Sequence, residues 1–146
     1  MDSLNAEIAL GTVTNVSEGA EWLGYTYLFV RMRKNPMVYG ENPTTAHMYG
    51  SNLVIGLTHE DPVNDPDLTE RRHTMIKTAA RKLAQAAMIR YDEGKDTFAI
   101  TDIGRIAAKY YVRHASIEVF QKEFRPRMTE ADVLAVLSMS TEVRKI

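Results

Sequence analysis

The sequence predicts a mainly α-helical fold with one small β-hairpin. Apolar residues recur at helical spacing through most of the 146 residues, as expected for helices with one buried face. Runs in which apolar and polar residues alternate lie on both sides of Glu93–Asp96, which is typical of a hairpin. A stretch rich in Pro, Gly, Asn and Thr, Asn35–Asp65, predicts a long loop between helices. A chain of this length holds one ordinary domain and the start of a second.

The composition excludes several classes of function. The 18 basic residues nearly balance the 19 acidic ones, so nucleic-acid binding would require a local patch. The absence of cysteine excludes disulfides, thiolate chemistry and cysteine-based metal sites. We expect no membrane partner, because no apolar run reaches the length of about 18 residues that spans a bilayer. The N-terminus does not resemble a secretory signal, so we expect a nuclear or cytoplasmic protein that is not secreted.

The first segment predicts one short helix. Ser3 is placed to cap a helix over Leu4–Leu10, and Gly11 suits its C-terminal end. A second, long helix is expected to begin at Asn15 or Ser17 and to end before Pro36.

The stretch Trp22–Met32 within this second helix is apolar on nearly all sides. Such a helix needs neighbours nearly all round, and a chain this short does not supply them all. Its aromatic side chains could instead form a base-stacking platform, but an interface with another domain is the favoured interpretation. The residues that we assign to a domain interface are Trp22, Tyr25, Phe29 and Met32.

Asp65-Pro66-Asp67 predicts the start of the next helix, which should run to about Ala87. The residues expected on its inner face are Ile76, Ala79, Leu83 and Ala87. Basic side chains lie off that face, where they could contact nucleic acid, form a solvated surface or meet an acidic protein. These candidate contacts are Arg71, Lys77, Arg81 and Lys82.

Met88–Thr101 is predicted to form a hairpin with its turn at Glu93–Asp96. Asp92-Glu93-Gly94-Lys95 superficially resembles an ATPase acidic box, but its position between two alternating runs favours a turn. The acidic residues in this turn would repel phosphates, so the turn is poorly suited to contact a nucleic-acid backbone.

Three helices are expected after the hairpin. The first is capped by Thr101 or Asp102, the second covers Ser116–Phe124, and the third begins at a capping box formed by Thr129–Asp132. The residues expected to face inward are Ile103, Ile106, Ala107 and Tyr110 or Tyr111 in the first, Ile117, Phe120 and Phe124 in the second, and Val133, Leu134 and Leu137 in the third.

This order of elements describes a winged-helix domain over residues 1–112, followed over residues 113–146 by the truncated start of a helical bundle. No catalytic, cofactor-binding or metal-binding residue is assigned. His47, His59, His73 and His114 are scattered, with no pair at the spacing of a helical metal site.

Several stretches of the chain together resemble one family. They are Glu7–Val16, Tyr25–Met32, Asn35-Pro36, Tyr39-Gly40, Arg81–Leu83, Met88–Tyr91 and Thr101–Ala107 with Tyr110-Tyr111. In order and spacing they are similar to the winged-helix segment of the two-cassette superfamily-two helicases, which include the activating-signal-cointegrator helicase and the spliceosomal snRNP helicase. The first half and Arg81–Tyr91 look closer to the cointegrator helicase, which is the favoured one of the two. Leu137–Ser140 looks at least as much like the spliceosomal one.

The resemblance implies a place within a larger enzyme. In this family two motor lobes bind ATP with Mg²⁺ and pull nucleic acid, and the winged helix connects them to a helical ratchet bundle. The fragment itself would then be a non-catalytic connector without a cofactor, whose partners are the motor lobes and ratchet of the same chain. RNA is the favoured substrate of the parent over DNA.

The sequence departs from the family pattern by an insertion at about residues 41–58, where the extra residues run from Glu41 to Ile55 and Gly56-Leu57-Thr58 resumes the pattern. No residue role is carried over to that insertion. The alternative interpretation is a free-standing winged-helix module that binds DNA or a protein through Arg71, Lys77 and Arg81.

Overall fold

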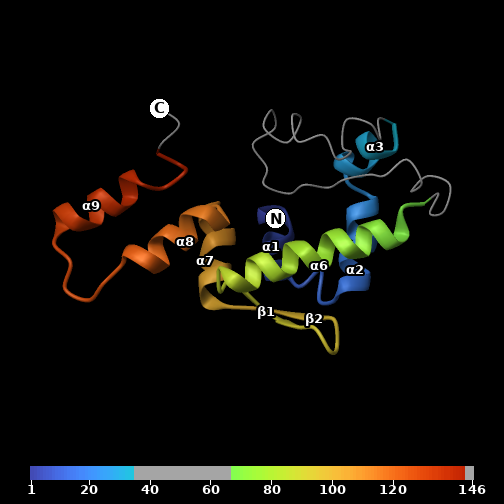
Figure 1. Cartoon of the computed structure of the whole chain (residues 1–146), viewed down its shortest axis with the longest axis horizontal. Coiled ribbons are helices and arrows are strands. Elements are labelled where there is room, and N and C mark those ends of the chain that lie inside the picture. Colours follow the sequence, from blue (N-terminus) through green and yellow to red (C-terminus); the bar gives the residue numbers. More distant parts are fainter. Residues whose placement is uncertain (35–66, 144–146) are drawn as a thin grey trace. The chain divides into compact units, whose positions relative to one another are not determined.

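A computed structural model describes residues 1–34 and 67–143 (Figure 1). The chain divides into two compact units, Met1–Asn15 with Ala79–Ile146 and Val16–Thr78, which we call the first and the second unit. The long loop predicted for Asn35–Asp65, with its insertion, lies outside the described residues. The predicted domain boundary at residue 112 stays a prediction.

The first unit contains the predicted hairpin. Strand β1, Ile89–Asp92, pairs antiparallel with β2, Thr97–Ile100, and Tyr91 lies opposite Phe98 (Figure 1). The Asp92 carboxylate accepts hydrogen bonds from the backbone N–H groups of Gly94 and Lys95 at 3.0 and 3.2 Å. An aspartate that binds the backbone two and three residues ahead stabilises a tight turn, so the position of the turn is confirmed.

The second edge of β2 is also occupied. The Phe98 N–H donates to the Thr14 carbonyl at 2.7 Å, and Asn15 forms an isolated bridge with Thr97. The segment after the first helix therefore pairs with β2 as a short third strand would, which satisfies backbone groups that an isolated hairpin would leave unpaired.

Helix α1 covers Asp2–Leu10 and packs against α7 and β2. It ends at Gly11, whose φ of 79° is the left-handed conformation predicted from the glycine. The predicted start at Ser3 is wrong, because the helix already begins at Asp2 and has no side-chain cap.

Helix α7 covers Asp102–Tyr110 and is capped by the Thr101 hydroxyl, which accepts from the Gly104 N–H at 3.0 Å. The cap agrees with the sequence prediction, but most of the predicted inner face is wrong. Gly104 and Ala107 are the residues that α7 buries. The larger side chains point to solvent instead, namely Ile103, Ile106, Tyr110 and Tyr111.

Gly104 explains this orientation of α7. An added Cβ at Gly104 would lie 2.0 Å from the Met88 carbonyl oxygen, so the helix approaches the chain before β1 too closely for a side chain. The face of α7 with the smallest residues must therefore turn inward, and the apolar periodicity alone does not reveal this.

Helices α8, His114–Glu123, and α9, Glu130–Ser138, complete the first unit. The capping box between Thr129 and Asp132 is present as predicted, with both reciprocal hydrogen bonds formed. Ile117 is buried as predicted. The expected inward positions of Phe124, Leu134 and Leu137 are wrong, because all three are exposed. In α9 the buried residue is Val136 instead.

The second unit shows that the predicted long helix is two helices. Helix α2, Val16–Gly24, and helix α3, Tyr27–Lys34, are separated by Tyr25 and Thr26. The Thr26 hydroxyl donates to the Leu23 carbonyl at 2.7 Å and accepts from the Phe29 N–H at 3.4 Å. Thr26 thus contacts the end of α2 and the start of α3. Its hydroxyl competes with the backbone hydrogen bonds of a continuous helix, so the apolar stretch forms two helices.

Helix α6, Thr69–Gln85, begins in the second unit and ends in the first. The predicted start at Asp65 and Pro66 lies outside the described residues. The predicted helix does not continue through Leu68, which has a φ of 51°, so α6 begins after it. Ile76, Ala79 and Leu83 are buried as predicted, whereas Ala87 lies beyond the helix end and is exposed.

Each unit has a set of buried apolar side chains. Those of the first unit are Leu4, Ile8, Val13, Ala79, Ala80, Leu83, Ala86, Met88, Ile89, Phe98, Ala107, Ile117 and Val136, and those of the second are Val16, Ala20, Leu23, Phe29, Met32, Leu68, Met75 and Ile76. Among the described residues, no helix is both long and apolar enough to cross a bilayer.

Candidate functional surfaces

Arg81, one of the four predicted nucleic-acid contacts, is held by the turn of the hairpin. Its Nε and Nη2 atoms donate to the two carboxylate oxygens of Glu93 at 2.8 and 3.3 Å. This bidentate pair, between two exposed side chains, raises the pKa of the Arg81 guanidinium, chiefly through the hydrogen bond to Glu93. A nucleic-acid phosphate would have to displace Glu93 before it could bind Arg81.

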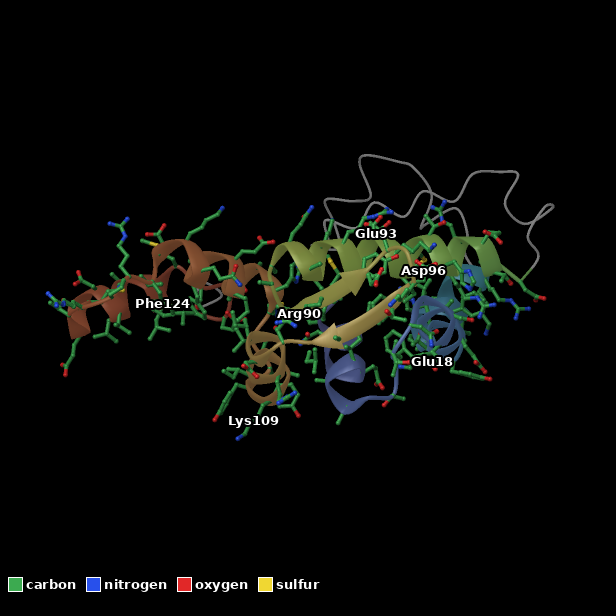
Figure 2. The ribbon with its side chains drawn as sticks, turned by 90° about the horizontal axis from the view of Figure 1, so that it is seen from below. Glu18, Arg90, Glu93, Asp96, Lys109 and Phe124 are labelled. Carbon is green, nitrogen blue, oxygen red and sulfur yellow. The ribbon has the colours of Figure 1, made fainter. Side chains whose placement is uncertain are left out.

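The turn also holds a second polar pair, between Tyr91 and Asp96. The Tyr91 hydroxyl donates to the Asp96 carboxylate at 2.8 Å, and the Tyr91 ring packs on Phe98 with centroids 5.3 Å apart. Burial, and then the hydrogen bond to Asp96, raise the pKa of Tyr91 to about 12. Figure 2 labels Glu93 and Asp96 at this turn. Asp96 therefore stabilises the hairpin itself, whereas Glu93 connects the turn to Arg81 on α6.

The three other basic residues predicted on α6 are Arg71, Lys77 and Lys82. Each is half-buried, and each takes part in interactions within the chain. Arg71 and Lys77 belong to the second unit and Lys82 to the first. Their role as nucleic-acid contacts stays a prediction.

Arg72 has a structural role that the sequence did not indicate. Its guanidinium donates to the Ala20 carbonyl at 3.1 Å and to the Thr69 hydroxyl at 3.3 Å, and it lies 5.1 Å from the centre of the Phe29 ring. These contacts tie α2, α3 and α6 together within the second unit. Only the three-dimensional arrangement distinguishes Arg72 from the neighbouring Arg71, because in sequence the two are adjacent and identical.

The four predicted interface residues differ in exposure. Phe29 and Met32 are buried within this chain, Trp22 is half-buried, and Tyr25 is 82% exposed. Of the four, Tyr25 thus offers the largest surface to a further domain, and the assignment of these residues to an interface stays a prediction.

Helix α7 presents a second apolar surface. Ile106 is 54% and Tyr110 is 64% exposed, and Tyr111, which ends the helix, is 91% exposed. Tyr111 has a φ of 57°, a left-handed conformation that glycine adopts more easily than tyrosine. Lys109, labelled in Figure 2, lies 5.4 Å from the centre of the Tyr110 ring. We call the exposed residues Ile103, Ile106, Tyr110 and Tyr111 the outer face of α7.

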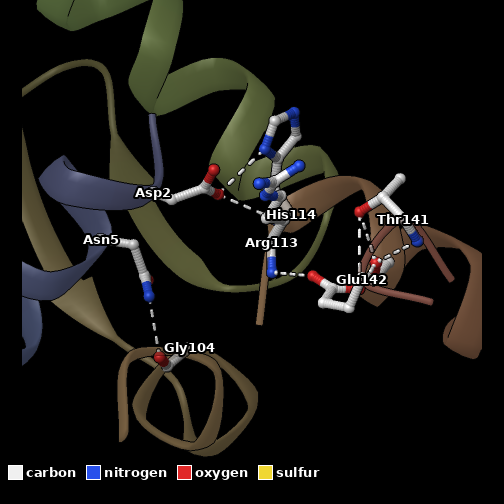
Figure 3. A network of polar contacts seen from close by, with 8 residues as sticks. Asp2, Asn5, Gly104, Arg113, His114, Thr141 and Glu142 are labelled. Carbon is white, nitrogen blue, oxygen red and sulfur yellow. Dashed lines mark hydrogen bonds and ion pairs between the residues drawn. The ribbon is translucent and has the colours of Figure 1, made fainter. Parts of the chain in front are cut away.

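Two carboxylates bind the N-terminus of α8 (Figure 3). Asp2 accepts from the backbone N–H of His114 at 2.9 Å and lies 3.0 Å from its ring Nδ1, while Glu142 accepts from the Arg113 N–H at 2.8 Å. Glu142 also accepts from the Ser116 hydroxyl. Carboxylates accept hydrogen bonds from the unpaired N–H groups at a helix N-terminus and interact favourably with the positive end of the helix dipole. These contacts therefore hold α8 between α1 and the segment after α9.

These carboxylates have lowered pKa values. Burial alone would raise the pKa of Asp2, but the hydrogen bonds from His114 outweigh it and hold this pKa below its usual value. In the same way the hydrogen bonds from Ser116 and Arg113 outweigh burial and lower the pKa of Glu142. Such values are typical of structural ion pairing and hydrogen bonding rather than of catalytic acids. Over residues 1–34 and 67–143, no three His, Cys, Asp or Glu side chains gather as a metal site.

Two family models match the chain in succession. Residues 1–92 match a family described as a winged helix-turn-helix domain, and residues 100–146 match the Sec63 Brl domain. The first match ends at Asp92, the last residue of β1, and the described helices and hairpin are consistent with a winged-helix domain. The chain belongs to the winged-helix family of the two-cassette superfamily-two helicases, as its sequence predicts.

Similar proteins match nearly the whole chain. The chain is 48% identical over 142 residues to the RQC trigger complex helicase SLH1 of Saccharomyces cerevisiae, a match that covers 97% of this chain. It is 43% and 41% identical over 145 residues to activating signal cointegrator 1 complex subunit 3 of Gallus gallus and of Homo sapiens, with 99% of this chain covered. In all three comparisons the chain spans only 6% of the length of the relative.

Proposed function

We propose that the chain is the non-catalytic winged-helix connector of a large ATP-dependent nucleic-acid helicase, which couples its motor lobes to its ratchet bundle. RNA is the proposed substrate of the parent, and ATP with Mg²⁺ would bind to its motor lobes. We place the parent in the nucleus or the cytoplasm.

The observation that carries this proposal is the tandem order of the two matches. A winged helix-turn-helix domain and a Sec63 Brl domain follow each other within 146 residues, and a relative with 48% identity is named a helicase. Because the chain spans 6% of that relative, the catalytic parts would lie in the rest of it. The outer face of α7 supports the same proposal, since it leaves large apolar side chains without cover in this chain.

A chimera tests the coupling. In the yeast relative, this chain would replace the matching 142 residues, with Ile106→Ser and Tyr110→Ser introduced together on the outer face of α7. If the connector transmits movement through this face, ATP hydrolysis persists while strand separation falls by about tenfold, the size of a typical coupling between sites. Lys95→Ser, at an exposed position in the hairpin turn, is the control and should leave both activities unchanged.

Two outcomes would overturn the proposal. In the chimera, an equal ratio of strand separation to ATP hydrolysis in the α7 variant and the control would show that α7 transmits nothing. For the chain alone, a phosphate-release assay with and without RNA is expected to show no turnover. Robust hydrolysis of ATP by the chain would mean that it is an enzyme in its own right.

A further inference from the structure

We infer that the exposed face of helix α3, with Arg33 at its side, binds single-stranded nucleic acid by stacking a base on Tyr27 and by pairing phosphates with Arg33 and Lys34. This site differs from the basic residues predicted on α6. It does not depend on the proposed role of the chain as a connector, because its evidence comes from α3 alone.

The first observation is the division of α3 into two faces. Phe29 and Met32 are buried, and Phe29 lies under the guanidinium of Arg72. With 3.6 residues per turn, the opposite side of the helix carries positions that are three, four and seven residues apart. That outer face consists of Tyr27, Val30, Arg31 and Lys34, and all four residues are exposed. Arg33 lies at the side of this face, four positions after the buried Phe29, and is exposed as well.

The second observation is the charge of this segment. Residues 22–34 contain Arg31, Arg33 and Lys34 and no acidic residue, although acidic residues outnumber basic ones in the whole chain. The three cations fall in the last turn of α3, so the positive charge is concentrated within a few residues. A concentrated cationic patch attracts a polyanion, which a chain of balanced net charge otherwise would not do.

The third observation is the exposed tyrosine beside these cations. Tyr27 is 75% exposed, and the Arg31 guanidinium lies 5.8 Å from the centre of its ring. An aromatic ring next to cations is the combination with which proteins hold single strands, since bases stack on the ring and phosphates meet the cations. Tyr25 extends the aromatic surface, although its hydroxyl is only 3.5 Å from the Glu21 carboxylate, which would repel phosphate.

A single strand fits this face better than an acidic protein segment does. Arginine and lysine would attract either partner, but the ring of Tyr27, a residue that is 75% exposed, offers a stacking platform for a base. A duplex fits less well, because its bases are already stacked and could not reach Tyr27 without unpairing.

Fluorescence anisotropy with labelled oligonucleotides tests the inference. The whole chain would be titrated with single-stranded uridine and thymidine oligomers of about 12 nucleotides, which is within the usual site size. Tyr27→Leu keeps an apolar side chain but removes the ring, and it should weaken binding by about tenfold. Arg33→Gln with Lys34→Gln should weaken binding and reduce the slope of log affinity against log salt by about 1.4, as expected for two lost phosphate contacts.

The matched control removes the same charge elsewhere. Arg125→Gln with Arg127→Gln changes two exposed cations between α8 and α9 and should alter affinity by less than about twofold. Circular dichroism of each variant establishes that the helices persist.

Three results would overturn the inference. The first is the absence of measurable binding by the unchanged chain. The second is an equal loss in the Arg125 and Arg127 control, which would reduce the effect to net charge. The third is competition by polyglutamate for the labelled oligonucleotide as strong as that by unlabelled oligonucleotide, together with normal binding by Tyr27→Leu. This result would identify an acidic protein surface as the partner.

Discussion

The side-chain amide of Asn5 donates a 2.9 Å hydrogen bond to the backbone carbonyl of Gly104, and this joins α1 to α7 within the first unit (Figure 3). Asn5 is buried, so the bond forms away from water. It lies beside the point where α7 comes closest to Met88. Close approach and the buried hydrogen bond together determine which face of α7 turns inward, and hence which face is left for a partner.

Gly104→Ala should therefore destabilise the chain strongly. The added methyl group would meet the Met88 carbonyl oxygen at 2.0 Å, and backbone cannot move aside as a flexible side chain can. We expect a loss of at least about 3 kcal/mol in the free energy of unfolding, at the upper end for overpacked cores. Urea denaturation followed by circular dichroism measures it.

The control for this substitution is Gly94→Ala in the hairpin turn. Its added methyl group would meet only the Asp92 carboxylate at 3.4 Å, so the effect should be small. If Gly104→Ala proved as stable as Gly94→Ala, the close approach of α7 to Met88 would be wrong.

Arg72→Lys should destabilise the second unit although it preserves the charge. Lysine has one ammonium group and cannot donate to Ala20 and Thr69 while it covers the Phe29 ring as the planar guanidinium does. We expect a loss of about 1–2 kcal/mol in the free energy of unfolding, the usual scale for a lost hydrogen bond with a buried acceptor. Trp22 lies in the second unit, so its fluorescence during urea denaturation reports on that unit.

Arg105→Lys provides the comparison for Arg72→Lys, because Arg105 is exposed on α7 in the first unit. It should unfold at the same urea concentration as the unchanged chain. Equal stability of the two variants would show that Arg72 does not hold α2, α3 and α6 together.

The sequence predicted the features of the fold that depend on neighbouring residues. Alternation before and after Glu93–Asp96 was enough to place the hairpin, because strand faces and turn residues are local signals. The helix caps at Thr101 and Thr129 were predicted for the same reason, since a cap involves residues only three positions apart.

Most of the errors come from contacts between distant segments, and one comes from a local side-chain contact. Ile106 and Tyr110 follow helical spacing as core residues do, but the approach of Gly104 to Met88 turned the opposite face inward. The break at Tyr25 and Thr26 reflects a hydroxyl that competes with the helix backbone, which apolar periodicity does not register. Arg72 was indistinguishable in sequence from Arg71, because its role comes from a carbonyl 52 positions away.

Acid should destabilise the first unit through Asp2 and Glu142. Hydrogen bonds to the folded chain lower both pKa values, so the folded state binds fewer protons than the unfolded state in acid. The stabilisation is complete above the ordinary carboxylate pKa of about 4 and is lost as the pH falls through the lowered values. The thermal midpoint followed from pH 7 to pH 3 should therefore decrease most steeply below about pH 4.

Asp2→Asn with Glu142→Gln should flatten this decrease, because neither amide gains a proton in acid. The control is Glu118→Gln, at an exposed position on α8. If the double variant lost stability between pH 7 and pH 3 as steeply as Glu118→Gln did, the two carboxylates would not be the acid-sensitive groups.

The capping box at the start of α9 lies in the segment that matches the Sec63 Brl domain. The Thr129 hydroxyl accepts from the Asp132 N–H, and the Asp132 carboxylate accepts from the Thr129 N–H at 2.9 Å, so each satisfies a donor that the helix leaves unpaired. Thr129→Ala should lower the free energy of unfolding by about 1 kcal/mol, the typical effect of a lost N-cap. Thr129→Ser keeps the hydroxyl and should retain most of that stability. Amide hydrogen exchange over Glu130–Ser138 measures the effect directly, and similar protection of this helix in both variants would show that the box does not hold it.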